Sequence, residues 1–217
     1  MAKRWRIATY DPARVAALER AAGIPAVVAQ LLLGRGIEHP DHARLFLEAK
    51  LSGLRDPEEL PGAMQAAEIL QQAIRDGRRI TVYGDYDCDG MTATAILLLG
   101  LRLAGGRADY YVPNRFDEGY GLNCEALRSL AAGGADVVIT VDCGITSLAE
   151  ARTAAELGLT LIITDHHQTV RRDGADCLPQ AAAIVHPGLA ERPYPFPGLC
   201  GAAVALKVAW ALCQRAS

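Results

Sequence analysis

Residues 79–103 read RITVYGDYDCDGMTATAILLLGLRL, and this stretch decides the fold. It opens with a short run of β-type residues, Arg79–Tyr83, and continues through a loop that holds three aspartates between two glycines. The apolar residues that follow recur at helical spacing, which predicts a helix over Thr92–Leu103. A strand, a glycine-bounded loop and a helix in this order are typical of a parallel β-sheet.

The same alternation continues along the rest of the chain. Helical segments separate short apolar runs, and continuous apolar strands of this kind are covered by helices on both faces. The predicted strands are Arg79–Tyr83, Asp109–Val112, Val137–Val141, Thr160–Thr164 and Ala183–Val185. The predicted helices are Thr92–Leu103, Asn123–Ala132, Ser147–Leu157 and Gly201–Cys213. We therefore expect an α/β fold with a parallel sheet as the middle of three layers.

The residues before the first strand are predicted to be helical. Apolar residues recur at helical spacing in four segments, and several of these begin near Pro or Asp and end before Gly. The segments are Pro12–Ala22, Pro25–Leu33, Pro40–Ala49 and Gly62–Arg75. Residues 51–61, LSGLRDPEELP, are rich in turn formers and predict a linker. We expect a helical N-terminal region over residues 1–60 and an α/β domain over residues 61–217.

Composition narrows the class of protein. The 217 residues are 51% apolar and 22% charged, which excludes a disordered, collagen-like or coiled-coil chain. A net charge of −3 argues against a uniformly basic coat for nucleic acid, although a local basic groove stays open. No secretory signal follows the basic N-terminus, and no apolar run approaches the roughly 20 residues of a membrane span. The six cysteines lack a CxxC pair and predict free thiols in a reducing cytoplasm.

Polar side chains follow each of the first four predicted strands. In open α/β sheets, ligands bind beyond the carboxyl ends of the strands, so these residues are candidates for one shared site. The first strand is followed by GDYDCDG (residues 84–90), the second by Pro113, Asn114 and Arg115, the third by Asp142, and the fourth by Asp165, His166 and His167.

The aspartates after the first strand predict a metal site. If the chain stays extended there, Asp85, Asp87 and Asp89 share one face and raise one another's pKa unless cations neutralise them. Adding Asp142 and His166 gives an oxygen-rich ligand set that suits Mn²⁺ or Mg²⁺. Four carboxylates favour two ions, which at about 3.5–4 Å apart can activate a water and stabilise a displacement at phosphorus.

Other interpretations of these residues compete with a metal site. The spacing from Asp85 to Gly90 matches the start of an EF-hand loop, but the twelfth position is Ile96 instead of a glutamate, and a strand precedes it. Simpler roles stay open for single residues: a helix N-cap for Asp89, a turn residue for Asp142, and solvent-exposed side chains for His166, His167 and Arg115.

Four motifs together resemble a known family. They are TVYGDYDCDGMTATA (81–95), VPNRFDEGYGL (112–122), VITVDCG (138–144), and IITDHH (162–167) followed by LPQAAAIVHP (178–187). In this order they resemble the DHH phosphoesterase superfamily, and more closely the RecJ-type single-stranded-DNA exonucleases, over about residues 62 to 213. The resemblance implies a metal-dependent exonuclease that hydrolyses phosphodiester bonds of single-stranded DNA from 5′ to 3′ in DNA repair and recombination.

The resemblance also implies roles for single residues. It implies that Asp87, Asp89, Asp142 and His166 are both catalytic and metal-binding, and that Asp85 is a further metal ligand. Asp142 is expected to be the bridging ligand of two divalent cations, Mn²⁺ or Mg²⁺. His167 is expected to be catalytic and to touch metal or phosphate, and Arg115 is expected to hold a phosphate oxygen. Asp165 is expected to orient a histidine.

The resemblance is incomplete at the C-terminal end. The family has a further metal-binding aspartate and a second, DHH-associated domain, neither of which was found before Ser217. The sequence ends just after the predicted helix Gly201–Cys213, so we expect part of a longer enzyme, with weak or absent activity alone. Expected partners are single-stranded DNA and, for the parent enzyme, single-strand-binding protein and a helicase, with no membrane and a monomeric state.

Two other functions are alternatives. One is a relative that hydrolyses oligoribonucleotides, cyclic dinucleotides or pyrophosphate, but such relatives usually lack the GDYDxDG form and the second motif. The other is a non-catalytic scaffold with the same fold. A scaffold would have no reason to keep Asp87, Asp89, Asp142 and His166 together, so the intact ligand set favours an enzyme.

Overall fold

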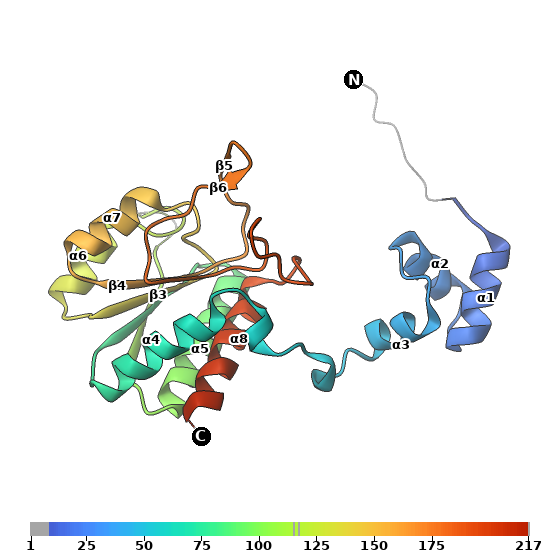
Figure 1. Ribbon diagram of the computed structural model, residues 1–217, viewed down its shortest axis with the longest axis horizontal. Coiled ribbons are helices and arrows are strands. Elements are labelled where there is room, and N and C mark those ends of the chain that lie inside the picture. The colour runs from blue at the N-terminus through green and yellow to red at the C-terminus, as the bar shows by residue number, and fades with distance from the viewer. Residues whose placement is uncertain (1–8, 115, 117, 217) are drawn as a thin grey trace. The chain divides into compact units, whose positions relative to one another are not determined.

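The computed structural model describes residues 9–114, 116 and 118–216 of the chain. The chain divides into two compact units, Met1–Arg55 and Asp56–Ser217. The functional division expected between residues 60 and 61 stays a prediction. The predicted α/β class is confirmed in the second unit, which contains a five-stranded parallel sheet with helices on both faces (Figure 1).

The first unit consists of three short helices. They are α1 (Pro12–Ala22), α2 (Ala26–Gly34) and α3 (Pro40–Glu48), each within one residue of its predicted bounds. The side chain of Asp11 caps α1 by accepting hydrogen bonds from the backbone N–H groups of Ala13 and Arg14. The buried apolar residues of this unit are Val15, Leu18, Ala29, Leu32 and Ala43. Two 3₁₀ turns, η1 (Leu51–Gly53) and η2 (Pro57–Glu59), occupy the predicted linker.

Within the described residues, no single helix has the length and apolar character needed to cross a membrane. The bent pair α1 and α2, which meet at 111°, meets the length and composition criteria only when the two helices are taken together.

The sheet of the second unit has the strand order β2-β1-β3-β4-β7, and every neighbouring pair is parallel. Its strands are β1 (Ile80–Tyr83), β2 (Ala108–Tyr111), β3 (Val137–Val141), β4 (Thr160–Thr164) and β7 (Ala183–Val185). The last three coincide with the prediction, and the first two agree to within one residue. From β1 the chain continues to β2 on one side of β1, and then to β3 on the opposite side of β1. The direction of strand addition reverses there, so the crevice between β1 and β3 is a topological switch point.

Helices cover both faces of this sheet (Figure 1). The helices are α4 (Ala63–Arg75), α5 (Cys88–Leu103), α6 (Cys124–Ala132), α7 (Leu148–Glu156) and α8 (Gly201–Ala216). Ile139 of β3 packs in the core with α4, α5 and α8, whereas its neighbour Val138 packs in the core with α6 and α7. Alternate residues of one strand thus enter opposite cores, which confirms the three-layer arrangement.

Two features were not predicted from the sequence. Strand β2 lies at the sheet edge, and its Asp109 and Tyr110 are exposed. Between β4 and β7 the chain forms a hairpin from β5 (Arg171–Arg172) and β6 (Ala175–Asp176). Asp173 and Gly174 in its loop both have positive φ, as the common two-residue hairpin turn requires. The Asp-Gly pair was the sequence signal for it.

Candidate functional site

The aspartate loop after β1 is less extended than predicted. Helix α5 begins at Cys88, four residues before the expected Thr92, and Asp87 is its N-cap. Oδ1 of Asp87 accepts hydrogen bonds from the backbone N–H groups of Asp89 (2.8 Å) and Gly90 (2.9 Å). The prediction that three aspartates line one face of an extended chain is therefore wrong, because capping the helix stabilises a turn there instead.

Asp89 lies in the first turn of α5 and contacts a segment far along the sequence. Its Oδ2 accepts a 2.7 Å hydrogen bond from the backbone N–H of Gly201, and its Oδ1 accepts one of the same length from Ala202. These residues form the N-terminus of α8, whose partial positive charge stabilises a carboxylate. Sequence reasoning missed this pairing, since a backbone donor leaves no signature beyond the glycine that begins a predicted helix.

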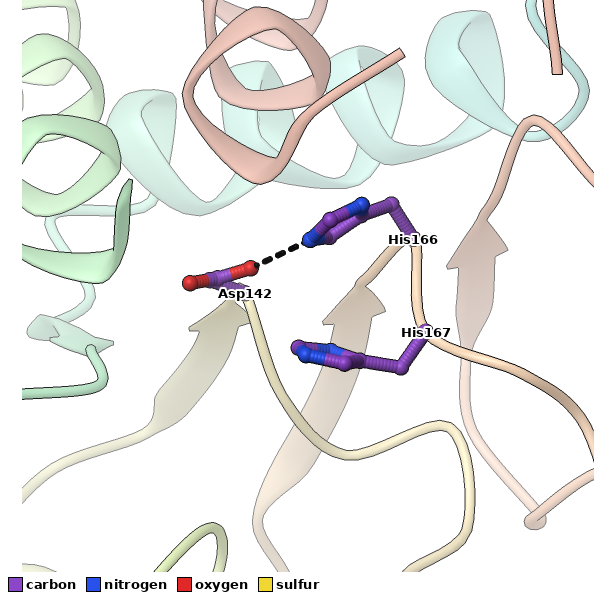
Figure 2. A group of neighbouring side chains, drawn as sticks. All are labelled: Asp142, His166 and His167. Carbon is purple, nitrogen blue, oxygen red and sulfur yellow. Dashed lines mark ion pairs between the residues drawn. The ribbon is translucent and has the colours of Figure 1, made fainter. Parts of the chain in front are cut away.

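Asp142 occupies the carboxyl end of β3, at the switch point of the sheet. It is 1% exposed, and its φ of 62° is in the left-handed region that aspartate tolerates better than most residues. Its Oδ1 receives no hydrogen bond from the described residues. Nε2 of His166, at the end of β4, lies 3.0 Å from that oxygen (Figure 2). The same nitrogen lies 3.4 Å from Oδ2 of Asp89. A buried carboxylate oxygen that receives no backbone N–H and lies this close to an imidazole nitrogen fits a pair of ligands for one cation.

The electrostatics of Asp142 agree with this geometry. Burial, followed by the negative charges of Asp89 and Asp87, raises the pKa of Asp142 to about 7. A cation among these carboxylates would reverse the repulsion and stabilise the ionised form.

Two groups of candidate metal ligands share Asp142. In each group, one ligand atom per residue lies within 4.8 Å of the others. The first group is Asp85, Asp87 and Asp142, and the second is Asp142, His166 and His167. Among the described residues, Asp89 belongs to neither group, although its carboxylate contacts His166. The donor set is rich in carboxylate oxygen with imidazole on one side, which fits Mn²⁺ or Mg²⁺ at two adjacent positions.

Asp165 fixes the segment that carries both histidines. Its Oδ1 accepts hydrogen bonds from the backbone N–H groups of His166 (2.7 Å) and His167 (3.1 Å), and Nδ1 of the His167 ring lies 2.7 Å from the same oxygen. Its Oδ2 accepts from the N–H of Ile145 at 2.9 Å. Although burial opposes it, these hydrogen bonds lower the pKa of Asp165. In turn, the hydrogen bond to Asp165 raises the pKa of His167.

The hydroxyl of Tyr120 lies next to His167, a contact that the sequence did not reveal. The two groups are 3.2 Å apart, measured from the hydroxyl oxygen to Nε2. With Nδ1 turned toward Asp165, Nε2 is the ring nitrogen that faces this hydroxyl. Burial raises the pKa of Tyr120, so the hydroxyl keeps its proton at neutral pH and can donate it to Nε2.

The second motif forms a loop beside the site. Oε1 of Glu118 accepts a 3.0 Å hydrogen bond from the N–H of Asn114, and its Oε2 contacts the hydroxyl of Tyr111. Gly119 and Gly121 both have φ of 80°, a backbone conformation that residues other than glycine adopt only at a free-energy cost. Arg115, the predicted phosphate ligand of this motif, lies outside the described residues.

His186, which follows β7, supports the histidine segment. Its Nδ1 accepts a 3.0 Å hydrogen bond from the N–H of Gly188, so Nε2 carries the proton of the neutral ring and donates it to the carbonyl of His167 at 2.8 Å. Burial lowers the pKa of His186 and so favours this neutral form. The residue belongs to the VHP segment of the fourth motif, and sequence reasoning assigned it no role.

A family model and several known proteins match this chain. Residues 79–216 match the DHH family, N-terminal domain. The chain is similar to the single-stranded-DNA-specific exonuclease RecJ of Bacillus subtilis (strain 168), with 44% identity over 209 residues, or 96% of this chain. It also resembles the crystal structure of RecJ in complex with Mn²⁺ from Thermus thermophilus, with a TM-score of 0.70, 32% identity and 98% of this chain covered.

A further crystal structure, of RecJ in complex with Mg²⁺ from the same organism, has a TM-score of 0.58 and 28% identity, again over 98% of this chain. All three relatives are much longer. The chain spans 26% of the Bacillus protein, 29% of the Mn²⁺-bound chain and 25% of the Mg²⁺-bound chain. It therefore corresponds to one part of these proteins.

Proposed function

The chain belongs to the DHH family, and on this premise we propose that it is the metal-binding part of an exonuclease that hydrolyses phosphodiester bonds of single-stranded DNA. The observation that carries the proposal is Asp142, a buried carboxylate at the switch point that belongs to two groups of potential metal ligands. The similarity to proteins named single-stranded-DNA-specific exonucleases supports the substrate.

We assign two divalent cations, Mn²⁺ or Mg²⁺, to the two ligand groups. Asp85 and Asp87 would hold one ion, His166 the other, and Asp142 both, with Asp89 close to the second. When bound, the ions supply positive charge for the phosphate and an activated water. The binding of Mn²⁺ and of Mg²⁺ by the Thermus relatives supports the choice of metals.

The other residues of the site hold these groups in place. Asp165 fixes the backbone of the histidine segment and the tautomer of His167, whose Nε2 then faces the hydroxyl of Tyr120. We propose that His167 contacts either a metal or the substrate phosphate, and that Arg115 contacts a phosphate oxygen. Both roles rest on the family resemblance.

The finer parts of the function follow the relatives. We propose 5′ to 3′ polarity, a role in DNA repair and recombination, action as a monomer, and contact of the parent enzyme with single-strand-binding protein and a helicase. We propose the cytoplasm as the compartment, which six free cysteines support. Weak or absent activity of this chain alone also stays a prediction.

Calorimetry of this chain with Mn²⁺ tests the metal site directly. We expect Asp142→Asn to weaken Mn²⁺ binding at least tenfold, because it removes the charge shared by both ligand groups. Asp136→Asn is the matched control, since Asp136 lies just before the opposite end of β3 and its hydrogen bond to the N–H of Arg79 survives the change. Equal Mn²⁺ affinity in both variants would refute the ligand role of Asp142.

The substrate is tested in a chimera in which this chain replaces the matching part of the Bacillus relative. We expect the chimera to degrade 5′-labelled single-stranded DNA with Mn²⁺ and to spare duplex DNA, and Asp142→Asn to abolish this activity. Preferential cleavage of oligoribonucleotides or cyclic dinucleotides would favour the alternative phosphodiesterase. A chimera that binds Mn²⁺ yet cleaves none of these substrates would favour a scaffold.

A further inference from the structure

A cavity of about 370 Å³ opens beside the two histidines of the site. Its lining includes His167, Gln168, Thr169, Arg171 and His186. Among the described residues that line it, none is acidic, in contrast to the carboxylates around Asp142. The site thus has a carboxylate side suited to cations and a neighbouring cavity whose lining includes the cationic side chain of Arg171. The volume is within the range of small-molecule sites, roughly 300–1,000 Å³.

Arg171 is held in this lining by a buried carboxylate. Its Nε lies 3.0 Å from Oδ1 of Asp176, whose side chain is only 5% exposed. Asp176 also accepts hydrogen bonds from the Thr169 hydroxyl and from the N–H of Ala190. Asp176 engages Nε, and among the described residues no hydrogen bond is formed by the terminal amino groups of Arg171. An arginine anchored in this way presents its remaining donors as a preformed fork.

The β5–β6 hairpin fixes which arginine faces the cavity. Arg171 pairs with Asp176 across the hairpin, and Arg172 pairs with Ala175. Successive strand residues point to opposite faces, and only the first of the two arginines lines the cavity. Arg172 therefore carries the same charge as Arg171 and is its neighbour in the sequence, but it does not line the cavity.

The histidines of the cavity do not form a separate metal site. Both ring nitrogens of His186 are engaged, one by the N–H of Gly188 and the other by the carbonyl of His167. It therefore has no lone pair for a metal. The polar groups left for a ligand include the terminal amino groups of Arg171 and the amide of Gln168, which suit an anion.

We propose that this cavity is a subsite for the phosphate of a nucleotide, held by Arg171 next to the metal centre. The ligand is either the released 5′-mononucleotide or a phosphate of the strand one step away from the bond that is cut. This identification of the ligand rests on the proposed function, whereas the anion-binding character of the cavity does not. The adjacent His167 links the subsite to the metal centre.

Binding of thymidine 5′-monophosphate to this chain, measured by calorimetry in EDTA and again with Mn²⁺, tests the subsite. We expect Arg171→Gln to weaken binding about tenfold in both conditions, as the loss of one charge-assisted hydrogen bond implies. Arg172→Gln should leave it unchanged, and Arg171→Lys should be intermediate because it keeps the charge but loses the fork. Mn²⁺ affinity should be equal in all three variants.

Two further probes define the ligand. Thymidine without phosphate should bind at least tenfold more weakly, and a short oligonucleotide that competes better than the monophosphate would assign the subsite to the strand instead of the product. Equal binding of thymidine, no detectable monophosphate binding, or equal effects of Arg171→Gln and Arg172→Gln would each overturn the subsite. If the wild-type chain bound the monophosphate in EDTA, with the expected effect of Arg171→Gln, but did not bind Mn²⁺, only the proposed metal centre would be refuted.

Discussion

Replacing Gly201 with alanine tests how the site is assembled. A Cβ atom at this position would lie 2.4 Å from Oδ1 and 2.7 Å from Cγ of Asp142, far below the 3.0 Å that real Cβ contacts respect. The side chain of Asp142 cannot easily move away from this added atom, because the residue is buried and its backbone is held at φ 62°. The N-terminus of α8 must move instead, and with it the two 2.7 Å hydrogen bonds to Asp89.

The magnitude follows from these contacts. The unrelieved clash would cost about 1–3 kcal/mol of folding free energy. A shift of α8 that relieves the clash would instead weaken the hydrogen bonds to Asp89, so the loss stays in the same range, since an intact hydrogen bond to a charged group contributes about 1.5–3 kcal/mol. Alanine should otherwise favour the helix by up to about 1 kcal/mol, so a net loss isolates the clash with Asp142. We expect the free energy of unfolding of Gly201→Ala to fall by about 1–3 kcal/mol and its Mn²⁺ affinity to fall at least tenfold.

Urea denaturation in EDTA and calorimetry with Mn²⁺ measure the two effects separately. Gly198→Ala is the matched control, because a Cβ there would meet only Phe196, at an ordinary 3.7 Å. If Gly201→Ala bound Mn²⁺ as tightly as Gly198→Ala, the idea that α8 positions the carboxylates would be wrong. A loss of stability without a loss of Mn²⁺ affinity would limit the role of Gly201 to packing.

Two further predictions concern pH and backbone support. Because the pKa of Asp142 rises from 3.8 to about 7 on folding, its protonated form stabilises the metal-free chain below pH 4, and this contribution is lost as pH rises through 7. The free energy of unfolding in EDTA should therefore fall more between pH 5 and pH 8 in wild type than in Asp142→Asn. His186→Ala removes the hydrogen bonds to His167 and Gly188 and should cost about 2–3 kcal/mol in urea denaturation, whereas no loss would contradict the supporting role.

The sequence predicted most of the sheet because its strands carry strong local signals. Val137–Val141 and Thr160–Thr164 are rich in β-branched residues and end at Asp142 and Asp165, so even their bounds agree with the structure. The position of the candidate site was also predictable, because ligands of open parallel sheets bind beyond the carboxyl ends of the strands.

The geometry within the site was less predictable. Extended and capped conformations of the Asp-x-Asp-x-Asp segment differ by a few backbone hydrogen bonds, and side-chain alternation alone cannot distinguish them. The contact of Asp89 with Gly201 joins positions more than a hundred residues apart through a backbone N–H, which every residue except proline carries. Such a contact depends on how α5 and α8 pack, and it has no local pattern.

Asp142 and Asp165 look alike in the sequence, but the fold compensates their charges differently. Both carboxylates are 1% exposed and follow neighbouring strands. Asp165 accepts backbone N–H groups on both oxygens, and its pKa is lowered despite burial. Among the described residues, no such donor reaches Oδ1 of Asp142, and its pKa is raised. This difference makes Asp142 the expected centre of metal binding.

Two of the neighbouring carboxylates are compensated as Asp165 is. Asp87 caps α5, and Asp89 accepts two N–H groups from α8, so helix N-termini offset part of their charge before any ion binds. Among the described residues, no backbone N–H donates to Oδ1 of Asp142, the residue common to both ligand groups. A bound cation would therefore supply to Asp142 the positive charge that helix N-termini supply to Asp87 and Asp89, and metal binding should stabilise the fold in part through this carboxylate.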